Sequence, residues 1–510
     1  MSDDTLSRFV HGTVLTFGGL VLGYGSEFGA RVLAARTLLV ADYGTIVLAS
    51  TLLGLVGTVS VFGVPVGLAR ELPRHDTPTD LFVGSLTFNV TVGVLISGAL
   101  LLATDPLTAL LQVGESEPLI RLFVAALPFF VFLELAVGGF RGCEDALGRV
   151  LIKSVSLRFL RFTGLLVALA VGLQTFWVGV VWVAPVAVAA AIGAVLLYVR
   201  TDLLSRSTVR NRRFGPIRDL YLFSFPVMLA FVLNNLIQQV DTLAIGVYVA
   251  TDAVGTYDAA FTLGRLFILF SVGFGFLFLP RFSDMHDSEE FEAMADLFKQ
   301  VSRWMTHLAF PVLLVVGAFP EQIIGIVFRD TYTVADLSFV LIALAFFLHA
   351  MAGPNMLGLI AIGRQKTVLL GSGIAFLTNV ALNVVLIPIL GITGAALASL
   401  LGFVCLNGVW SLELYRAIGA RPRFRPVFLS ISGTMLVFFA GVTVLPLTVG
   451  SSVVSLVATL AATAVLHLMS LFVLGGFQES DLFLFTTVSR WLPVTEATLV
   501  RVFKRWVIRF

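Results

Sequence analysis

The hydrophobic residues of this chain form long runs, separated by short polar or glycine-containing breaks. A helix needs roughly 20 apolar residues to cross a bilayer, because every backbone amide in lipid must be bonded within the helix. The pattern predicts an all-α integral membrane protein with about fourteen transmembrane helices. Gly172 to Phe176 and Leu390 to Thr393 are the shortest breaks and are interpreted as turns. The predicted spans begin near Phe9, Tyr43, Asp80, Leu119, Ser156, Phe176, Leu220, Asp252, Val301, Asp336, Thr367, Ile392, Pro426 and Ser452.

The composition excludes a soluble enzyme. The chain is 58% hydrophobic and only 13% charged, with a mean hydropathy of +0.99, whereas soluble domains are about 45 to 50% apolar and about 25% charged. A net charge of +2 gives no basic excess for binding nucleic acid. The two cysteines, Cys143 and Cys405, lie far apart, and no Cys or His cluster has the spacing of metal ligands. We therefore expect no metal site, no disulfide framework and no cofactor.

The basic residues predict the orientation, since Lys and Arg are retained on the cytoplasmic side of short loops. With the amino terminus inside, all but five of the 33 Lys and Arg residues fall on cytoplasmic segments. That total includes Arg158 and Arg161, which open the fifth span and are expected to snorkel to the inner headgroups. The pattern predicts a multi-pass protein of the cytoplasmic membrane with both termini in the cytoplasm. The five exceptions are Arg31, Arg36, Arg121, Arg265 and Arg329.

An internal repeat divides the first twelve spans into two halves. Tyr43-Gly44-Thr45 aligns with Val254-Gly255-Thr256, and at the same offset Ala69-Arg70 aligns with Pro280-Arg281. Halves with an even number of helices are parallel repeats, related by an axis along the membrane normal. We therefore predict two parallel six-helix bundles with a substrate site between them.

The predicted domains follow from this repeat and from the basic segments. The first six-helix lobe is expected at 1–200, a basic cytoplasmic linker at 201–218, and the second lobe at 219–416. Two additional transmembrane helices are expected at 417–476. The last segment, 477–510, has apolar and basic residues on opposite helical faces, which is typical of an amphipathic tail on a lipid surface.

Two stretches of the chain resemble a known family. Residues 29–70 contain the run ARTLLVADYG, a following helix, and the ending GVPVGLAR. These features resemble the start of the polysaccharide biosynthesis proteins, the oligosaccharide flippases of the multidrug/oligosaccharidyl-lipid/polysaccharide (MOP) exporter superfamily. Residues 240–266 resemble the second repeat of that family in the same way. The resemblance implies two lobes that rock around a central cavity and pass a lipid-linked oligosaccharide between leaflets.

Charged residues inside the spans are the first candidates for the site, because a charge in hydrocarbon is costly. Glu27 and Arg31 are four residues apart, so they share a helical face and can pair, and Arg36 follows. One interpretation is a neutralised pair near the outer interface. The other is that Arg31 and Arg36 attract the phosphate of the carrier lipid, since a guanidinium binds such oxygens with two hydrogen bonds.

The seventh span carries a polar stripe of Asn234, Gln238 and Asp241. Such a stripe does not face lipid comfortably. It either holds helices together through hydrogen bonds or lines a cavity, where amides suit sugar hydroxyls because both groups donate and accept. Glu27 aligns with Gln238 under the repeat, which favours equivalent polar faces in the two halves.

In the eighth span Asp258, Thr262 and Arg265 fall on one face. Arg265 is the deepest cation and is predicted to contact the phosphate, with a salt bridge to Asp258 as the alternative. Glu27, Asp241 and Asp258 are the candidates for binding a coupling ion, H⁺ or Na⁺.

The function predicted from these features is a flippase for a lipid-linked oligosaccharide of the polyprenyl or dolichyl phosphate type. Its expected partners are that substrate, membrane lipids and glycan-assembly enzymes. An ATP-driven mechanism is not expected, because the chain has no phosphate-cradling motif. Three alternatives stay open: a cation-coupled multidrug extruder of the same superfamily, a membrane-embedded glycan polymerase or glycosyltransferase, and a scaffold for glycan assembly.

Overall fold

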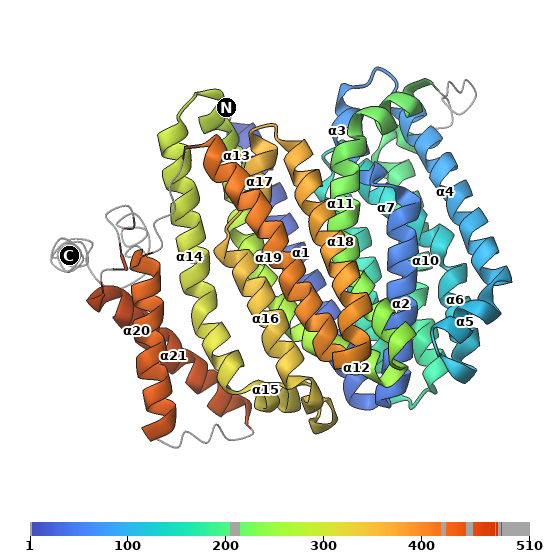
Figure 1. Cartoon of the computed structure of the whole chain (residues 1–510). Coiled ribbons are helices and arrows are strands. Elements are labelled where there is room, and N and C mark those ends of the chain that lie inside the picture. Colours follow the sequence, from blue (N-terminus) through green and yellow to red (C-terminus); the bar gives the residue numbers. More distant parts are fainter. Residues whose placement is uncertain are drawn as a thin grey trace. The chain divides into compact units, whose positions relative to one another are not determined.

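The computed structural model describes residues 3–204, 215–419, 425–444, 452–474, 476–477 and 481, and its regular structure there is entirely helical (Figure 1). The first elements are α1 (Asp3–Thr37), α2 (Val40–Val61), α3 (Val64–Glu71), α4 (Pro78–Leu102), α5 (Thr104–Leu110), α6 (Glu117–Ala125), α7 (Leu127–Gly142), α8 (Ala146–Val150), the π-helix η3 (Leu151–Phe159), α9 (Leu160–Ala170) and α10 (Thr175–Arg200). There follow α11 (Gly215–Tyr248), α12 (Thr251–Gly264), the 3-10 turn η5 (Arg265–Phe267), α13 (Ile268–Asp287), α14 (Phe291–Ala318), α15 (Pro320–Val327), the 3-10 turn η6 (Asp330–Ala335), α16 (Asp336–Met351), α17 (Asn355–Ala361), α18 (Gln365–Leu390), α19 (Ile392–Ala417), α20 (Arg425–Val444) and α21 (Val453–Val473).

The predicted membrane-spanning helices are found. Among the described residues, 10 helical segments are long and apolar enough to cross a bilayer, and each matches one predicted span. The other four predicted spans fall on α1, on the continuous helix formed by α8, η3 and α9, on α11 and on α20. Helix α9 ends at Ala170 and α10 begins at Thr175, so the first of the two shortest breaks is a turn. The second is also a turn, since α18 ends at Leu390 and α19 begins at Ile392.

One helix begins well before the start of its predicted span. The helix that carries the fifth predicted span begins at Ala146, ten residues before Ser156, because α8, η3 and α9 follow one another without a break. The Asp145 side chain caps the start, accepting a hydrogen bond from the Gly148 amide at 3.0 Å. Burial alone would raise the pKa of this carboxyl, but hydrogen bonds from Arg200 and Gly148 lower it overall. Arg158 and Arg161 therefore lie in the middle of a continuous helix.

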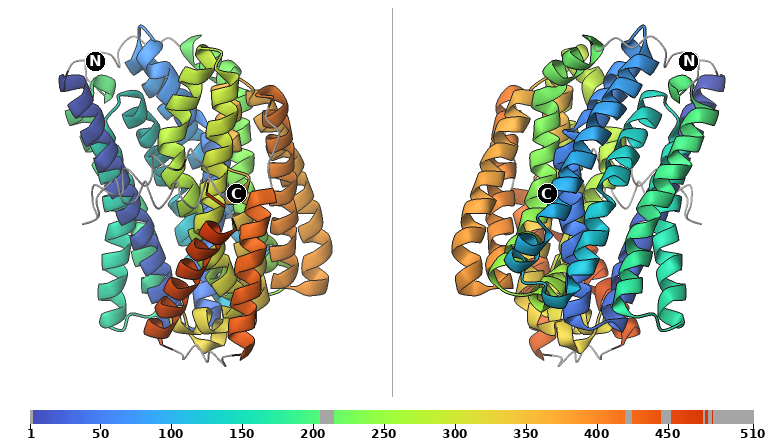
Figure 2. Two further views of the ribbon diagram at one scale, coloured as in Figure 1. Left: turned by 90° about the vertical axis from the view of Figure 1, so that its left-hand side faces the viewer. Right: turned by 90° about the vertical axis from the view of Figure 1, so that its right-hand side faces the viewer.

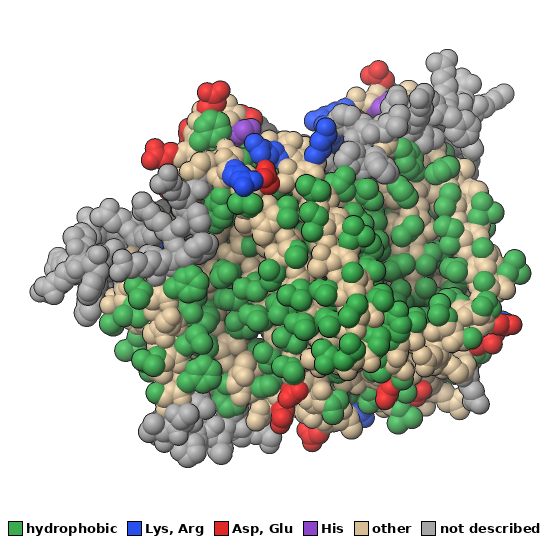
Figure 3. Space-filling view, viewed as in Figure 1, with side chains coloured by type: hydrophobic (Ala, Val, Ile, Leu, Met, Phe, Trp, Pro, Cys, Tyr) green, Lys and Arg blue, Asp and Glu red, His purple; other side chains and the backbone are tan. Residues whose placement is uncertain are grey.

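The surface of the helices is apolar along most of their length. In Figure 3 hydrophobic side chains cover the middle of the helices on the viewed face, and charged side chains gather near helix ends. Exposed side chains include Leu95 on α4, Val199 on α10, Leu377 on α18 and Leu436 on α20. An exposed apolar surface of this kind is stable only against lipid, so the chain is a multi-pass membrane protein.

The chain divides into two compact units: Met1–Thr262 with Val368–Gly402, and Leu263–Thr367 with Phe403–Phe510. The boundaries fall inside α12, near the start of α18 and inside α19, and most of α18 belongs to the first unit. The predicted lobes at 1–200 and 219–416 stay a prediction. Parts of the predicted linker and most of the predicted tail, residues 205–214 and 482–510, lie outside the described residues.

In the first unit the two aligned repeat motifs touch each other. A methyl group added at Gly44 of α2 would lie 1.7 Å from the Thr251 carbonyl oxygen and 2.9 Å from the Gly255 amide nitrogen. A methyl added at Gly255 of α12 would lie 2.6 Å from the Val40 carbonyl oxygen. Glycine at both positions therefore lets the backbones of α2 and α12 approach closely, as in other membrane helix pairs.

We expect the substitution Gly44→Ala to destabilise the protein by at least about 1–3 kcal/mol, because the clash is with backbone that cannot move aside. Thermal unfolding of the purified chain in detergent would measure this loss. Gly98→Ala on α4 is the matched control, since a methyl group there meets nothing within 4 Å. Equal melting temperatures for the two variants would contradict the close approach.

In the second unit, the two C-terminal helices α20 and α21 pack on each other and on α14. The His467 ring nitrogen of α21 lies 3.3 Å from that of His307 of α14, and 2.8 Å separate His467 from the Thr434 hydroxyl of α20. Nearby, the buried Arg303 of α14 pairs with Asp481 at 2.5 Å. These polar contacts fix the C-terminal helices to the rest of their unit.

Candidate functional site

Four charged side chains from three helices form one cluster in the first unit. Arg31 of α1 lies 3.4 Å from Glu27 on the preceding turn and also donates to Asp258 of α12. Arg161 of α9 donates to the second Glu27 oxygen at 3.0 Å. Tyr43 of α2 donates its hydroxyl to the other Asp258 oxygen. Two arginines and two carboxylates therefore alternate in one buried or half-buried network.

The predicted pair of Glu27 and Arg31 is confirmed, and the structure extends it. Asp258 has Arg31 as a partner, which the sequence did not indicate because the two lie on different helices. Thr262 donates to Asp258 at 3.5 Å, which agrees with the predicted shared face of the eighth span. The cluster is electrostatically compensated, so it can stay buried in a membrane-spanning unit.

The sequence did not predict Arg161 as a site residue, since this arginine was expected to snorkel to the inner headgroups. Its Nε atom donates to the Trp182 carbonyl oxygen of α10 at 2.9 Å, and its guanidinium lies 5.3 Å from the centre of the Trp182 ring. The Asp145 cap was the signal that could have found it, because a helix that begins at Ala146 places Arg161 well inside the span.

Asp241 of α11 is enclosed by neutral donors. Its side chain accepts hydrogen bonds from Tyr257 at 2.8 Å, Asn379 at 3.0 Å, Asn383 at 2.6 Å and Ser399. Asp241 is fully buried, and no basic side chain pairs with it among the described residues. Hydrogen bonds to neutral dipoles compensate a buried carboxylate only in part, so this group is suited to bind a proton or a small cation.

The oxygen atoms around Asp241 support that chemistry. Asn379 and Asn383 are one turn apart on α18, and Ser399 comes from α19. The Asn383 Oδ1 atom is buried and lacks a hydrogen-bond partner among the described residues. Carboxylate, amide and hydroxyl oxygens are the ligands that hard cations prefer.

The other predicted residues are placed as follows. Asn234 and Gln238 of α11 are half-buried, on the stripe that leads to Asp241. Arg36 near the end of α1 is exposed, and Arg265 is half-buried in η5, in the second unit. The roles of these residues in binding stay predictions.

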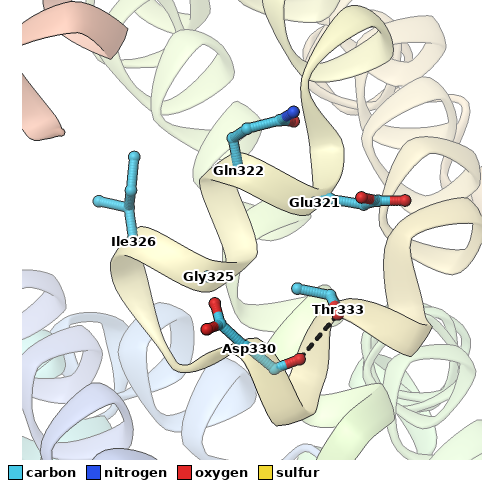
Figure 4. Close-up of a pocket in the computed structure, with 6 residues that line it drawn as sticks. All are labelled: Glu321, Gln322, Gly325, Ile326, Asp330 and Thr333. Carbon is cyan, nitrogen blue, oxygen red and sulfur yellow. Dashed lines mark hydrogen bonds between the residues drawn. The ribbon is translucent and has the colours of Figure 1, made fainter. Parts of the chain in front are cut away.

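A separate pocket of about 440 Å³ lies in the second unit, between α15 and η6 (Figure 4). In Figure 4 the Glu321 and Asp330 side chains flank it, and the Thr333 hydroxyl donates to the Asp330 carbonyl oxygen at 2.7 Å. Gln322, Gly325 and Ile326 complete its lining. None of the predicted site residues belongs to this pocket.

The family model for polysaccharide biosynthesis proteins matches residues 9–286. The chain belongs to this family. A second model, MatE, matches residues 226–385. The resemblance predicted from residues 29–70 and 240–266 is therefore confirmed, and both stretches lie within the matched region.

Two relatives come from Haloferax volcanii. This family member is 24% identical over 400 residues to a protein described as a probable low-salt glycan biosynthesis flippase, Agl15, covering 75% of this chain and 78% of that protein. It is 25% identical over 209 residues to the probable flippase AglR, covering 39% and 43% of the two chains.

Solved structures show the same fold. The lipid II flippase MurJ in an inward closed conformation superimposes with a TM-score of 0.69 at 13% identity, covering 94% of this chain and 100% of that one. An inward-facing MATE family multidrug transporter of the MOP superfamily gives a TM-score of 0.64 at 16% identity, covering 78% and 94%. The predicted all-α membrane fold of this superfamily is therefore confirmed.

Proposed function

We propose that this chain is a flippase that moves a lipid-linked oligosaccharide across the cytoplasmic membrane by alternating access. The observation that carries the proposal is the cluster of Arg31, Glu27, Arg161 and Asp258 inside membrane-spanning helices of a polysaccharide biosynthesis protein. Charges in a membrane protein's interior are retained where they serve a substrate or an ion. The names of the two Haloferax relatives support the same class of activity.

In this proposal the cations bind the phosphate and the amides bind the sugar. Arg31, Arg36 and Arg265 are assigned to the phosphate or pyrophosphate of the carrier, because guanidinium groups bind such oxygens in pairs. Asn234 and Gln238 are assigned to sugar hydroxyls. The neighbouring Gln239 supports this role for α11, since its buried Oε1 atom has no hydrogen-bond partner among the described residues.

The coupling ion, H⁺ or Na⁺, is assigned first to Asp241. Glu27 and Asp258 were equal candidates by sequence, but arginines neutralise both of them in the structure. Asp241 has only neutral donors around it, so binding a cation there gains a full charge interaction. The protein then works as a transporter and not as an enzyme, alongside the glycan-assembly enzymes that make its substrate.

Gene deletion followed by analysis of lipid-linked glycans tests this function. We expect one oligosaccharide carrier to accumulate on the inner leaflet, and the intact gene to restore its export. The alternative is the cation-coupled multidrug extruder, which the MatE match over residues 226–385 favours. Deletion without any glycan accumulation, but with greater sensitivity to cationic drugs, would contradict the flippase and support the extruder.

A further inference from the structure

The segment that packs against α1 in the first unit is an unusual helix. Nine residues, Leu151–Phe159, form the π-helix η3 between α8 and α9, and α1 lies beside this whole stretch (Figure 2). In a π-helix each amide bonds to the carbonyl five residues back, and such segments are frequent at functional sites. Residues four and five apart therefore share a face here, which groups Ser154 and Lys153 with Arg158.

The Arg158 side chain packs against α1. Its guanidinium lies 5.2 Å from the centre of the Tyr24 ring. A methyl group added at Gly23 would lie 2.9 Å from Arg158 Nη1 and 3.0 Å from the Ser154 hydroxyl. The absence of a side chain at Gly23 therefore leaves the room that the guanidinium occupies, and Tyr24 supplies a cation–π contact.

The surface along which α1 packs on η3 is called the α1–η3 seam. The charges along this seam and on its neighbours do not balance. Lys153 pairs with Glu134 of α7 at 2.9 Å, Arg161 pairs with Glu27 at 3.0 Å, and Arg31 pairs with Asp258. Arg158 forms no salt bridge with any described carboxylate; it contacts the Tyr24 ring and interacts electrostatically with Glu134, which is already paired with Lys153. The seam therefore carries four cations and three anions, and the remaining positive charge is on Arg158.

Arg158 also lies deep in the helix. It is twelve residues from Ala146 and twelve from Ala170, the two ends of the continuous helix. An arginine side chain does not extend that far, so the guanidinium does not reach either end of the helix. The carboxylate that interacts with Arg158, Glu134, already pairs with Lys153. A half-buried cation that lacks a salt bridge of its own is costly inside a membrane-spanning helix unless an anionic ligand completes the site.

We propose that Arg158, with Ser154 and Tyr24, is a phosphate-binding site at mid-depth on the α1–η3 seam, and that its ligand is the phosphate of the polyprenyl carrier. This inference rests on the proposed flippase function and deepens it. The site lies between Lys153, on one side along the helix, and Arg161 on the other. A phosphate that travels through the membrane is then bound by a fixed cation midway, with the neutralised pairs above and below it.

Titration of the purified full chain tests the site. The probe is a short-chain polyprenyl phosphate, and short-chain phosphatidylglycerol represents the bulk anionic lipids. We expect Arg158→Gln to weaken polyprenyl phosphate binding at least tenfold, and Arg158→Lys to retain part of the affinity because it keeps the charge. Arg121→Gln is the matched control, since Arg121 is half exposed and pairs with Asp105 at 3.5 Å.

Stability separates a binding role from a structural one. Arg158→Gln should melt at the temperature of the unmodified protein or above it, because no described carboxylate loses a salt bridge and Glu134 keeps Lys153. Gly23→Ala provides a second variant, which keeps every charge but crowds the guanidinium, and it should also weaken binding. A large drop in melting temperature for Arg158→Gln would assign Arg158 to structure and overturn the proposal.

The remaining outcomes distinguish the two hypotheses. Unchanged polyprenyl phosphate binding in Arg158→Gln would overturn this site alone and leave the flippase proposal standing. An equal loss of phosphatidylglycerol binding would show that the site takes bulk phospholipid, and would overturn the assignment of its ligand. If the unmodified protein binds no polyprenyl phosphate, the proposed function itself fails.

Discussion

Replacing Arg31 with alanine is expected to abolish translocation and to lower the free energy of unfolding by about 3–5 kcal/mol, because removal of one partner leaves buried charge uncompensated. Arg31 is the link between Glu27 and Asp258, so its loss affects both carboxylates. Transport of a fluorescent lipid-linked sugar into proteoliposomes measures the first effect, and thermal unfolding measures the second. Arg416→Ala is the control, since that exposed arginine pairs with Glu413 at the surface and such pairs contribute only about 0–1 kcal/mol.

A double variant separates binding from structure. Arg31→Ala combined with Asp258→Asn removes both members of the pair, while Glu27 keeps Arg161. We expect the melting temperature to recover toward that of the unmodified protein while translocation stays absent. Recovery of translocation in the double variant would show that Arg31 serves only to neutralise Asp258, and would refute its role as a phosphate ligand.

Asp241→Asn is expected to slow ion-driven translocation at least tenfold. The substitution keeps the shape of the side chain but removes the charge, and the new amide would face the donating amides of Asn379 and Asn383. Transport in proteoliposomes with a Na⁺ gradient, and separately with a proton gradient, should show which ion loses its effect. Insertion into the membrane should be normal.

Asn89→Ala is the matched control for this variant. Asn89 is a buried amide of the same unit, donating to the Ser85 carbonyl oxygen and to the Tyr221 hydroxyl, both at 2.7 Å. It should lower stability without changing the ion dependence. If Asp241→Asn responds to both gradients as the unmodified protein does, coupling passes to Glu27 or Asp258.

The sequence determined the fold class because hydrocarbon imposes a strict length and polarity on each span. Helices α2, α4, α10 and α18 could therefore be located to within a few residues of their observed starts. The pair of Glu27 and Arg31 was also predictable, since residues four apart on a helix are neighbours. Family membership followed from local runs of residues in the same way.

Only the tertiary structure decided which side chains meet across helices. Asp258 and Arg31 are far apart in the sequence, as are Asp241 and Ser399, and hydropathy contains no information about which helix faces pack together. The π-helix was also not predicted, because the apolar run of the fifth span was placed from Ser156 onward and the residues before it were not assigned to a helix. Length and polarity fix that a segment spans the membrane, whereas the partner of each buried charge depends on the rotation and depth of the helices, which packing sets.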